Sequence, residues 1–267
     1  MRIFEIPEGS KTSKGRAIQN LINIEQDDKV KAFINTQDLK DTEYVNSHYV
    51  VMATKKGQIK KTSLEKYSRP RINGINAITI KENDELLEAK LTNGNSEILM
   101  AVKSGKAIRF EESKTRPMGR SASGVRGIRL KDDKDEVIGM VSVNDVSTDM
   151  LVVSKNGYGK RSSLEDYRIT NRGGKGVKTI SITEKTGSLV AIKNVSDEND
   201  LMIINKSGIA IRMSVEKLRV MGRATQGVKL INLKGEDTIA AVAKVIKEDE
   251  TDDNSQENSA ENEDLSI

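Results

Sequence analysis

The chain has 267 residues, a formal net charge of +4, 36% hydrophobic and 3% aromatic residues, and neither Cys nor Trp. This composition excludes disulfides and thiolate metal sites, and it favours many short strands over an aromatic ligand pocket. No stretch reaches the roughly 20 apolar residues that a membrane-spanning helix needs, so we expect a cytoplasmic protein with no membrane partner.

Charge is distributed unevenly along the chain. Residues 248–267 hold nine acidic groups and no basic one, which leaves 44 basic and 31 acidic residues, a net +13, on the remainder. A body this basic favours a polyanion partner, with nucleic acid as the first candidate. Evenly spread solubility charge is the alternative. Because the acidic segment lacks apolar content and periodicity, we expect residues 1–246 to fold and residues 247–267 to form a disordered tail.

In chain order, the first recognisable element is half of a repeat. The segment "KGRAIQNLINIEQDDKVKAFI", beginning at Lys14, matches the second half of the units described below, so the first unit is expected to be incomplete. An insertion around "TQDLKDTEYVNSHY" then lengthens the connection to the next unit.

Four hairpin-like stretches follow. They are "VVMATKKGQIKKTS", "ILMAVKSGKAIRFE", "MLVVSKNGYGKRSS" and "LMIINKSGIAIRMS", and each has an apolar run, a turn and a short alternating run. Their turn glycines, Gly57, Gly105, Gly157 and Gly208, are 48, 52 and 51 residues apart and are expected to supply positive φ angles. The stretches "SLEKY", "SLEDY" and "SVEKL" after three of the hairpins resemble single helical turns.

Each unit continues through a basic stretch to a second glycine and two further apolar runs, which gives about four strands per unit. The second glycines are Gly74, Gly124, Gly176 and Gly227. A period of this length is typical of propeller blades. We therefore expect an all-β, propeller-like ring of about five four-stranded blades. The expected repeats are residues 1–48, 49–96, 97–148, 149–199 and 200–246.

Basic residues recur at matching places in these repeats. The residue four positions after the turn glycine is Lys61, Arg109, Arg161 or Arg212, and further cations precede the second glycine. Because rotation would place equivalent residues in a belt around the ring, we expect this belt to contact phosphates and bend a duplex. A solvated outer face is the alternative. The residues predicted to bind DNA are Lys60, Lys61, Arg71, Arg109, Arg120, Lys160, Arg161, Arg172, Lys175, Arg212 and Arg223.

Catalytic chemistry is not indicated. His48 is the only histidine, which argues against a Ser/His/Asp triad or a histidine metal site. Tyr67 and Tyr167 occupy matching positions, which suggests packing. The stretch "TNRGGKGVKTI", residues 170–180, has the glycines and lysine of a phosphate loop but leads into a strand-like run, whereas a P-loop delivers its amides at a helix N-terminus. No catalytic or metal-binding residues are predicted.

Residues 1–246 resemble the C-terminal, DNA-wrapping domain of DNA gyrase A, and this resemblance implies that the ring is a β-pinwheel. The stretches that carry the resemblance are "FEIPEGSKTSKGRAIQNLINIEQDD", "VVMATKKGQIKKTSLEKY", "RPMGRSASGVRGIRL", "SKNGYGKRSSLEDY" and "VMGRATQGVKLINL". The resemblance implies a nucleoid-associated, DNA-bending module of an ATP-hydrolysing type II topoisomerase that introduces negative supercoils. It also implies that the catalytic tyrosine lies in the N-terminal part of gyrase A, and that gyrase B, in the A2B2 heterotetramer, binds ATP and Mg²⁺. No cofactor is expected in this chain.

The family's hallmark heptapeptide is Gln, Arg, Arg, Gly, Gly, Lys, Gly in the first blade. Its nearest counterpart here is degenerate and lies in a later repeat: Thr170, Asn171, Arg172, Gly173, Gly174, Lys175 and Gly176. The resemblance therefore implies that the full heptapeptide lies upstream of Met1. By analogy, the acidic tail competes with DNA for the basic surface, or it only solubilises the protein. Two alternatives to gyrase remain: the matching domain of topoisomerase IV, and a propeller-type protein-interaction scaffold.

Overall fold

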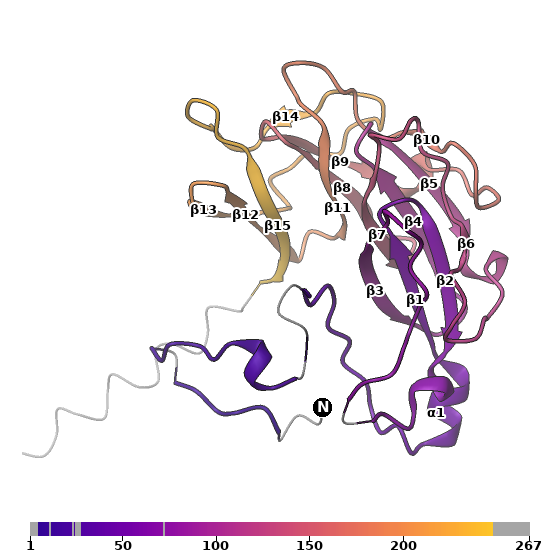
Figure 1. Ribbon diagram of the computed structural model, residues 1–267. Helices are drawn as coiled ribbons and strands as arrows, with labels where there is room; N and C mark the ends of the chain where they lie inside the picture. Colours follow the sequence, from indigo (N-terminus) through magenta and orange to yellow (C-terminus); the bar gives the residue numbers. More distant parts are fainter. Residues whose placement is uncertain (1–4, 11, 23, 25–27, 72, 248–267) are drawn as a thin grey trace, which may run out of the picture. The chain divides into compact units, whose positions relative to one another are not determined.

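The computed structural model describes residues 5–10, 12–22, 24, 28–71 and 73–247, so the predicted disordered tail lies outside the described residues except for Lys247. The chain, whose helices and strands are labelled in Figure 1, divides into two compact units by its contacts. Unit 1 contains the chain up to residue 96 together with residues 112–127, and unit 2 contains residues 97–111 and the chain from residue 128 onward. The division cuts across the repeats because one segment of the second hairpin repeat belongs to unit 1.

Unit 1 is built on one sheet, with strand order β3-β1-β2-β6. Its strands are β1 (Tyr49–Thr54), β2 (Gln58–Ser63), β3 (Leu86–Thr92) and β6 (Val125–Arg126). The helical elements are α1 (Thr42–Ser47), η2 (Ile18–Asn20), η3 (Leu64–Tyr67) and η4 (Glu112–Lys114). The helix α1 falls in the predicted insertion, where the residue pattern shows only weak helical periodicity. It is only six residues long, and the Asp41 side chain caps it by accepting a hydrogen bond from the Tyr44 amide.

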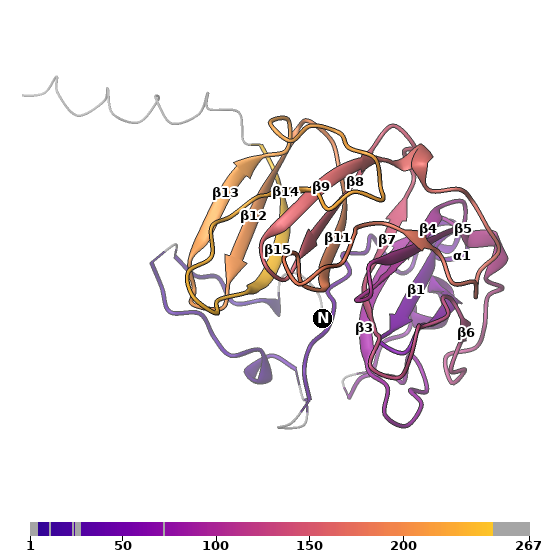
Figure 2. The ribbon, with the colours of Figure 1, turned by 90° about the horizontal axis from the view of Figure 1, so that it is seen from above.

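Unit 2 contains three antiparallel sheets, with orders β10-β5-β4-β7, β11-β8-β9-β14 and β13-β12-β15 (Figure 2). The first sheet contains β4 (Glu97–Val102), β5 (Lys106–Glu111), β7 (Val137–Val143) and β10 (Val177–Lys178). The second contains β8 (Asp149–Ser154), β9 (Tyr158–Ser163), β11 (Leu189–Val195) and β14 (Val228–Lys229). The third contains β12 (Asn199–Asn205), β13 (Ala210–Ser214) and β15 (Ile239–Ile246). The predicted all-β fold is confirmed, and all four predicted hairpins form.

The first of the predicted single turns forms as η3, and the second forms as η5 (Leu164–Asp166). The third is a turn closed by a 2.9 Å hydrogen bond from the Leu218 amide to the Val215 carbonyl.

The continuous apolar runs are explained by burial on both sides of the central strands. In β8, Met150 and Val152 belong to one core cluster and Leu151 and Val153 to another. Because successive side chains of a strand point to opposite faces, a strand that lies between two packed layers must be apolar at every position. Tyr167 lies fully buried in the first cluster, where burial raises its pKa to about 12, so the predicted packing role of this residue is confirmed.

The outer strand of three sheets comes from the following repeat. The short strands β6, β10 and β14, which follow the second glycines, pair with β2, β5 and β9 of the preceding repeat. We call these three the exchanged strands. The amides of Gly127, Thr179 and Leu230 donate to the carbonyls of the turn glycines Gly57, Gly105 and Gly157, at 2.8 to 2.9 Å. Each of these three sheets therefore takes three strands from its own repeat and one from the next.

Three of the four second glycines lie where an exchanged segment crosses the preceding hairpin and leave no room for a Cβ, whereas a Cβ on Gly74 would meet no atom within 4 Å. Gly227 has φ +79°, and a Cβ at this position would lie 2.4 Å from the Gly159 carbonyl oxygen. Gly124 and Gly176 show the same close approach to the backbone, at 2.6 and 2.5 Å. The last sheet has three strands and no exchanged strand among the described residues, and a Cβ on its turn glycine, Gly208, would meet no atom within 4 Å.

Two glycines provide a matched test of this crossing. Both Gly227 and Gly208 have positive φ angles, so Gly208→Ala should cost only the backbone strain, about 1–2 kcal/mol. Gly227→Ala should cost about 1–3 kcal/mol more because the new methyl group overlaps a carbonyl oxygen. Urea unfolding of both variants would measure the difference. Equal losses would show that the crossing relaxes without strain.

Candidate nucleic-acid interface

The cation four positions after the turn glycine is held by structural contacts in three of the four hairpins: Lys61 and Arg109 are buried, and Arg161 is largely enclosed. Arg109 on β5 is 8% exposed. Its Nε donates to Glu97 at 2.6 Å, and its Nη1 donates to the carbonyls of Leu164 and Tyr167 at 2.8 and 3.0 Å. The guanidinium thus joins its own hairpin to the segment that enters from the next repeat. It does not face solvent, so the DNA contact predicted for it from the repeat pattern is not supported.

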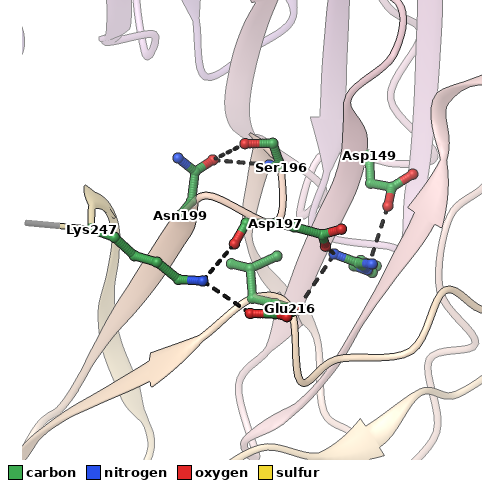
Figure 3. Close-up of polar contacts among 8 residues, drawn as sticks. Asp149, Ser196, Asp197, Asn199, Glu216 and Lys247 are labelled. Carbon is green, nitrogen blue, oxygen red and sulfur yellow. Dashed lines mark hydrogen bonds and ion pairs between the residues drawn. The ribbon is translucent and has the colours of Figure 1, made fainter. Parts of the chain in front are cut away.

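Arg161 on β9 makes contacts of the same kind, and Figure 3 labels its two acidic partners, Asp149 and Asp197. Its Nη1 contacts Asp197 at 2.5 Å and the Val215 carbonyl at 3.4 Å, while its Nε forms an ion pair with Asp149 at 3.4 Å without hydrogen-bond geometry. The Asp197 carbonyl also accepts a 2.8 Å hydrogen bond from Lys247, whose ammonium pairs with Glu216 at 3.2 Å. These contacts tie the end of β15 to the loops that follow β11 and β13.

The other two cations at this position of the hairpin, Lys61 and Arg212, differ from each other in burial. Lys61 on β2 is buried and paired with Glu112 at 2.9 Å. Arg212 on β13 is exposed and pairs with Asp200 at 2.7 Å. No exchanged segment lies beside Arg212 among the described residues, which explains why it alone of the four remains at the surface.

The predicted contacts Lys60 and Lys160 are also buried. The Lys60 ammonium donates to the carbonyls of Ala77 and Arg120, and the Lys160 ammonium donates to the Gly222 carbonyl at 2.5 Å. Desolvation by burial lowers the pKa of both lysines to about 8. Both ammonium groups hold the backbone of the loop that precedes an exchanged strand, so they position that loop and leave no ammonium exposed for a phosphate.

We call the three loops that precede the exchanged strands the crossing loops. The degenerate heptapeptide, Thr170–Gly176, lies in the one that precedes β10. The Thr170 amide donates to the Arg109 carbonyl at 2.9 Å, and Gly176, at φ +69°, approaches the Ala107 carbonyl. Gly173 has φ +82°, and the Gly174 carbonyl accepts a 2.8 Å hydrogen bond from the Arg129 amide. The glycines therefore serve the strand exchange. The exposed cation of this loop is Lys175, and Arg172 is half-buried.

The remaining predicted cations lie in similar loops of their own units. Arg71 is exposed and Arg120 is half-buried. Arg223 is half-buried because its guanidinium donates to the carbonyls of Lys178 and Asp166, at 2.6 and 3.0 Å. It links the last crossing loop to the exchanged strand β10 and to the end of η5.

Two rows of exposed cations were not singled out as the main contacts from the sequence. The exchanged strands carry a cation two residues after the second glycine, and the crossing loops carry one eight residues before it. The six exposed residues are Arg126, Lys178 and Lys229 on the strands, and Arg116, Arg168 and Arg219 in the loops. Counting from the second glycine would have revealed both rows. We call these six residues the outer cations.

Two other kinds of site were sought in the described part of the chain. Among its residues, no group of three or more histidine or acidic side chains is arranged to hold a metal ion. Within the same residues, no helix is both long and apolar enough to cross a membrane.

Comparison with known proteins gives one family. The family model described as the DNA gyrase C-terminal domain, a β-propeller, matches residues 1–37, 48–93, 96–144, 148–196 and 199–246. The DNA gyrase A protein of Staphylococcus aureus strain MRSA252 is 44% identical over 262 residues, which cover 98% of this chain and 29% of that protein. The protein of strain NCTC 8325 is 43% identical over 264 residues, with the same coverage. The chain thus spans less than a third of the length of the curated relatives it matches.

Solved structures show the same fold. The C-terminal domain of a DNA topoisomerase IV aligns with a TM-score of 0.82 at 22% identity, covering 91% of this chain and 74% of the other. A DNA gyrase A C-terminal domain aligns with a TM-score of 0.76 at 25% identity, covering 88% and 76%. At 22% identity the first likeness shows the fold alone, whereas the family is shown by the family model that matches most of the chain.

Proposed function

Because the chain belongs to the family of DNA gyrase C-terminal domains, we propose that it binds and bends double-stranded DNA as the C-terminal part of gyrase A. The observation that carries the proposal is the recurrence of the outer cations at fixed offsets in successive repeats, all exposed. Ammonium and guanidinium groups on edge strands and loops contact phosphates without reading bases, which suits a module that must accept any sequence.

The rest of the proposal concerns the whole enzyme. In this proposal, strand cleavage and rejoining take place in the N-terminal part of gyrase A, and ATP and Mg²⁺ are bound by gyrase B in an A2B2 complex. The chain would then contribute to supercoiling only by holding a curved DNA segment, which orients the duplex for the catalytic groups carried elsewhere in the enzyme.

The two alternatives are less well supported. Topoisomerase IV shares the fold, but the curated relatives with 43–44% identity over nearly the entire chain are gyrase A proteins. A scaffold for an acidic protein would use the same exposed cations. It would not require them to recur along consecutive sheets, whereas a long polyanion of constant charge spacing does.

A salt titration tests the proposal. The 267-residue chain should bind a short duplex of arbitrary sequence at low salt. The logarithm of its affinity should fall by about 0.9 per logarithm of salt for each phosphate neutralised. The chain should also accelerate ring closure of short DNA, because bending brings the ends together. Binding that is absent at low salt, or that ignores salt, would contradict the proposal.

A further inference from the structure

The hairpin turns carry a second repeated lysine, two residues before the turn glycine. These turn lysines are Lys55, Lys103, Lys155 and Lys206. In two turns the lysine is neutralised by a carboxylate from the loop before the next strand. Lys55 pairs with Glu85 at 3.0 Å, and Lys103 pairs with Glu136 at 3.3 Å.

The turn at Lys155 has lost this compensation. At equal distance before the following strand, Ser188 replaces Glu85 and Glu136, and Gly187 replaces the preceding aspartate. That aspartate holds the turn elsewhere: Asp135 accepts hydrogen bonds from the Ser104 amide and hydroxyl at 3.0 and 2.7 Å.

Here Asn156 holds the turn instead. Its side-chain amide donates to the carbonyls of Glu184 and Lys185, at 3.0 and 3.2 Å. The turn is therefore kept in shape without any acidic group, and Lys155 is left without its carboxylate.

Positive charge gathers beside this turn. Lys155, Lys185, Lys229 and Tyr158 line a surface cavity of about 360 Å³ in unit 2. Lys229 on the exchanged strand lies directly opposite Tyr158, and the Lys185 ammonium lies 5.4 Å from the centre of the tyrosine ring. None of the three lysines forms an ion pair within the described part of the chain.

Two acidic groups also line the cavity. They are Glu236 and Asp237. Asp237 is engaged elsewhere: it accepts from the Ser207 hydroxyl at 2.7 Å, and this hydrogen bond is the main cause of its lowered pKa. Three ammonium groups against two carboxylates leave the cavity positively charged, and the tyrosine hydroxyl adds a neutral donor.

We propose that this cavity, here called the turn pocket, binds a phosphate group of the DNA backbone. The inference rests on the proposed function and adds to it one phosphate contact that the loop members of the outer cations do not make. Lys229 belongs both to the outer cations and to the turn pocket, so a DNA backbone that contacts Lys229 also lies beside the pocket. Because no carboxylate forms an ion pair with these three lysines in the described part of the chain, their ammonium groups are open to an anion.

The chain itself supplies the variants that test the turn pocket. Ser188→Glu introduces the residue found at the equivalent place in two other repeats, so it should pair with Lys155 and leave the fold unchanged. We expect weaker binding of a short duplex and a salt slope smaller by about 0.9, the value of one phosphate contact. Ser147→Glu, at the opposite end of β8, adds the same charge away from the pocket and should leave the slope near that of the unmodified chain.

The reciprocal variant, Glu136→Ser, removes the carboxylate that neutralises Lys103 and should not weaken binding. If the unmodified chain binds DNA but Ser188→Glu and Ser147→Glu behave alike, the turn pocket is wrong while the proposed function stands. If the unmodified chain does not bind DNA, the proposed function itself fails. Nuclear magnetic resonance shifts at Gly187 and Tyr158 should respond to the duplex; a response to inorganic phosphate alone would assign the cavity to a free anion and overturn the inference.

Discussion

Replacing Glu112 by leucine should destabilise unit 1 by about 3–5 kcal/mol, although leucine is the residue found at the equivalent position of two other repeats. Glu112 is 1% exposed, and its carboxylate pairs with Lys61 at 2.9 Å and accepts from the Thr92 hydroxyl at 2.8 Å. Removing the carboxylate would leave the Lys61 ammonium buried without a counter-charge. A loss of that size is large against the stability of a typical domain.

Lys61 depends on Glu112 because its own hairpin supplies no acidic partner. In the next two hairpins the arginine at this position pairs with an acidic residue at the start of its own hairpin, Glu97 or Asp149. The first hairpin has Tyr49 at that place, and the Lys61 ammonium lies 4.2 Å from the centre of its ring. An aromatic face attracts a cation but does not neutralise it, so the carboxylate must come from the following repeat.

The double variant Lys61→Met, Glu112→Leu separates charge from packing. Since a buried ion pair can be replaced by apolar residues of similar size at little cost, the double variant should recover most of the stability lost in Glu112→Leu. Chemical unfolding would measure the unmodified chain and both variants. If the double variant is as unstable as the single one, the loss arises from packing around η4 and not from the buried charge.

Sequence reasoning located the hairpins because their signals are local. An apolar run, a glycine that requires positive φ and an alternating run lie within about fifteen residues, and Gly57, Gly105, Gly157 and Gly208 all have φ between 80° and 86°. The family resemblance then extended these units to the β-pinwheel fold. In both cases the residues that determine the structure are neighbours in the sequence.

The strand exchange could not be read in the same way. Val125 pairs with Ile59, and Val228 pairs with Gly159. Nothing within either short strand specifies a partner so far away in the chain. The only local trace is the second glycine, which reads equally well as an ordinary turn residue until the carbonyl beneath it is known.

Because the sequence does not reveal the strand exchange, it also gives the wrong location for three of the repeated cations. Repetition shows that Lys61, Arg109 and Arg161 are equivalent, but not whether their common place is inside or outside. Without the exchanged strand, β2, β5 and β9 are edge strands, and cations on edge strands face solvent. With it, these strands become interior strands, and their cations are enclosed and paired with carboxylates.

Replacing Arg168, Lys178, Arg219 and Lys229 together by alanine should reduce the salt slope of DNA binding by up to about 3.6, four contacts at about 0.9 each. All four side chains are exposed, so the free energy of unfolding should change little, within about 0.5 kcal/mol per site. Gel shifts over a salt series and urea unfolding would measure the two quantities on the same protein.

Arg109→Met is the matched comparison, because it removes one cation of the buried row. It should lower stability by on the order of 3 kcal/mol, since Glu97 loses its partner and two carbonyls lose a donor, while the salt slope of the remaining folded protein stays unchanged. The opposite pattern would refute the division into structural and phosphate-contacting rows: a flattened slope in Arg109→Met, or an unchanged slope in the fourfold variant. The row that contains Arg109 and the row of outer cations would then differ in burial but not in function.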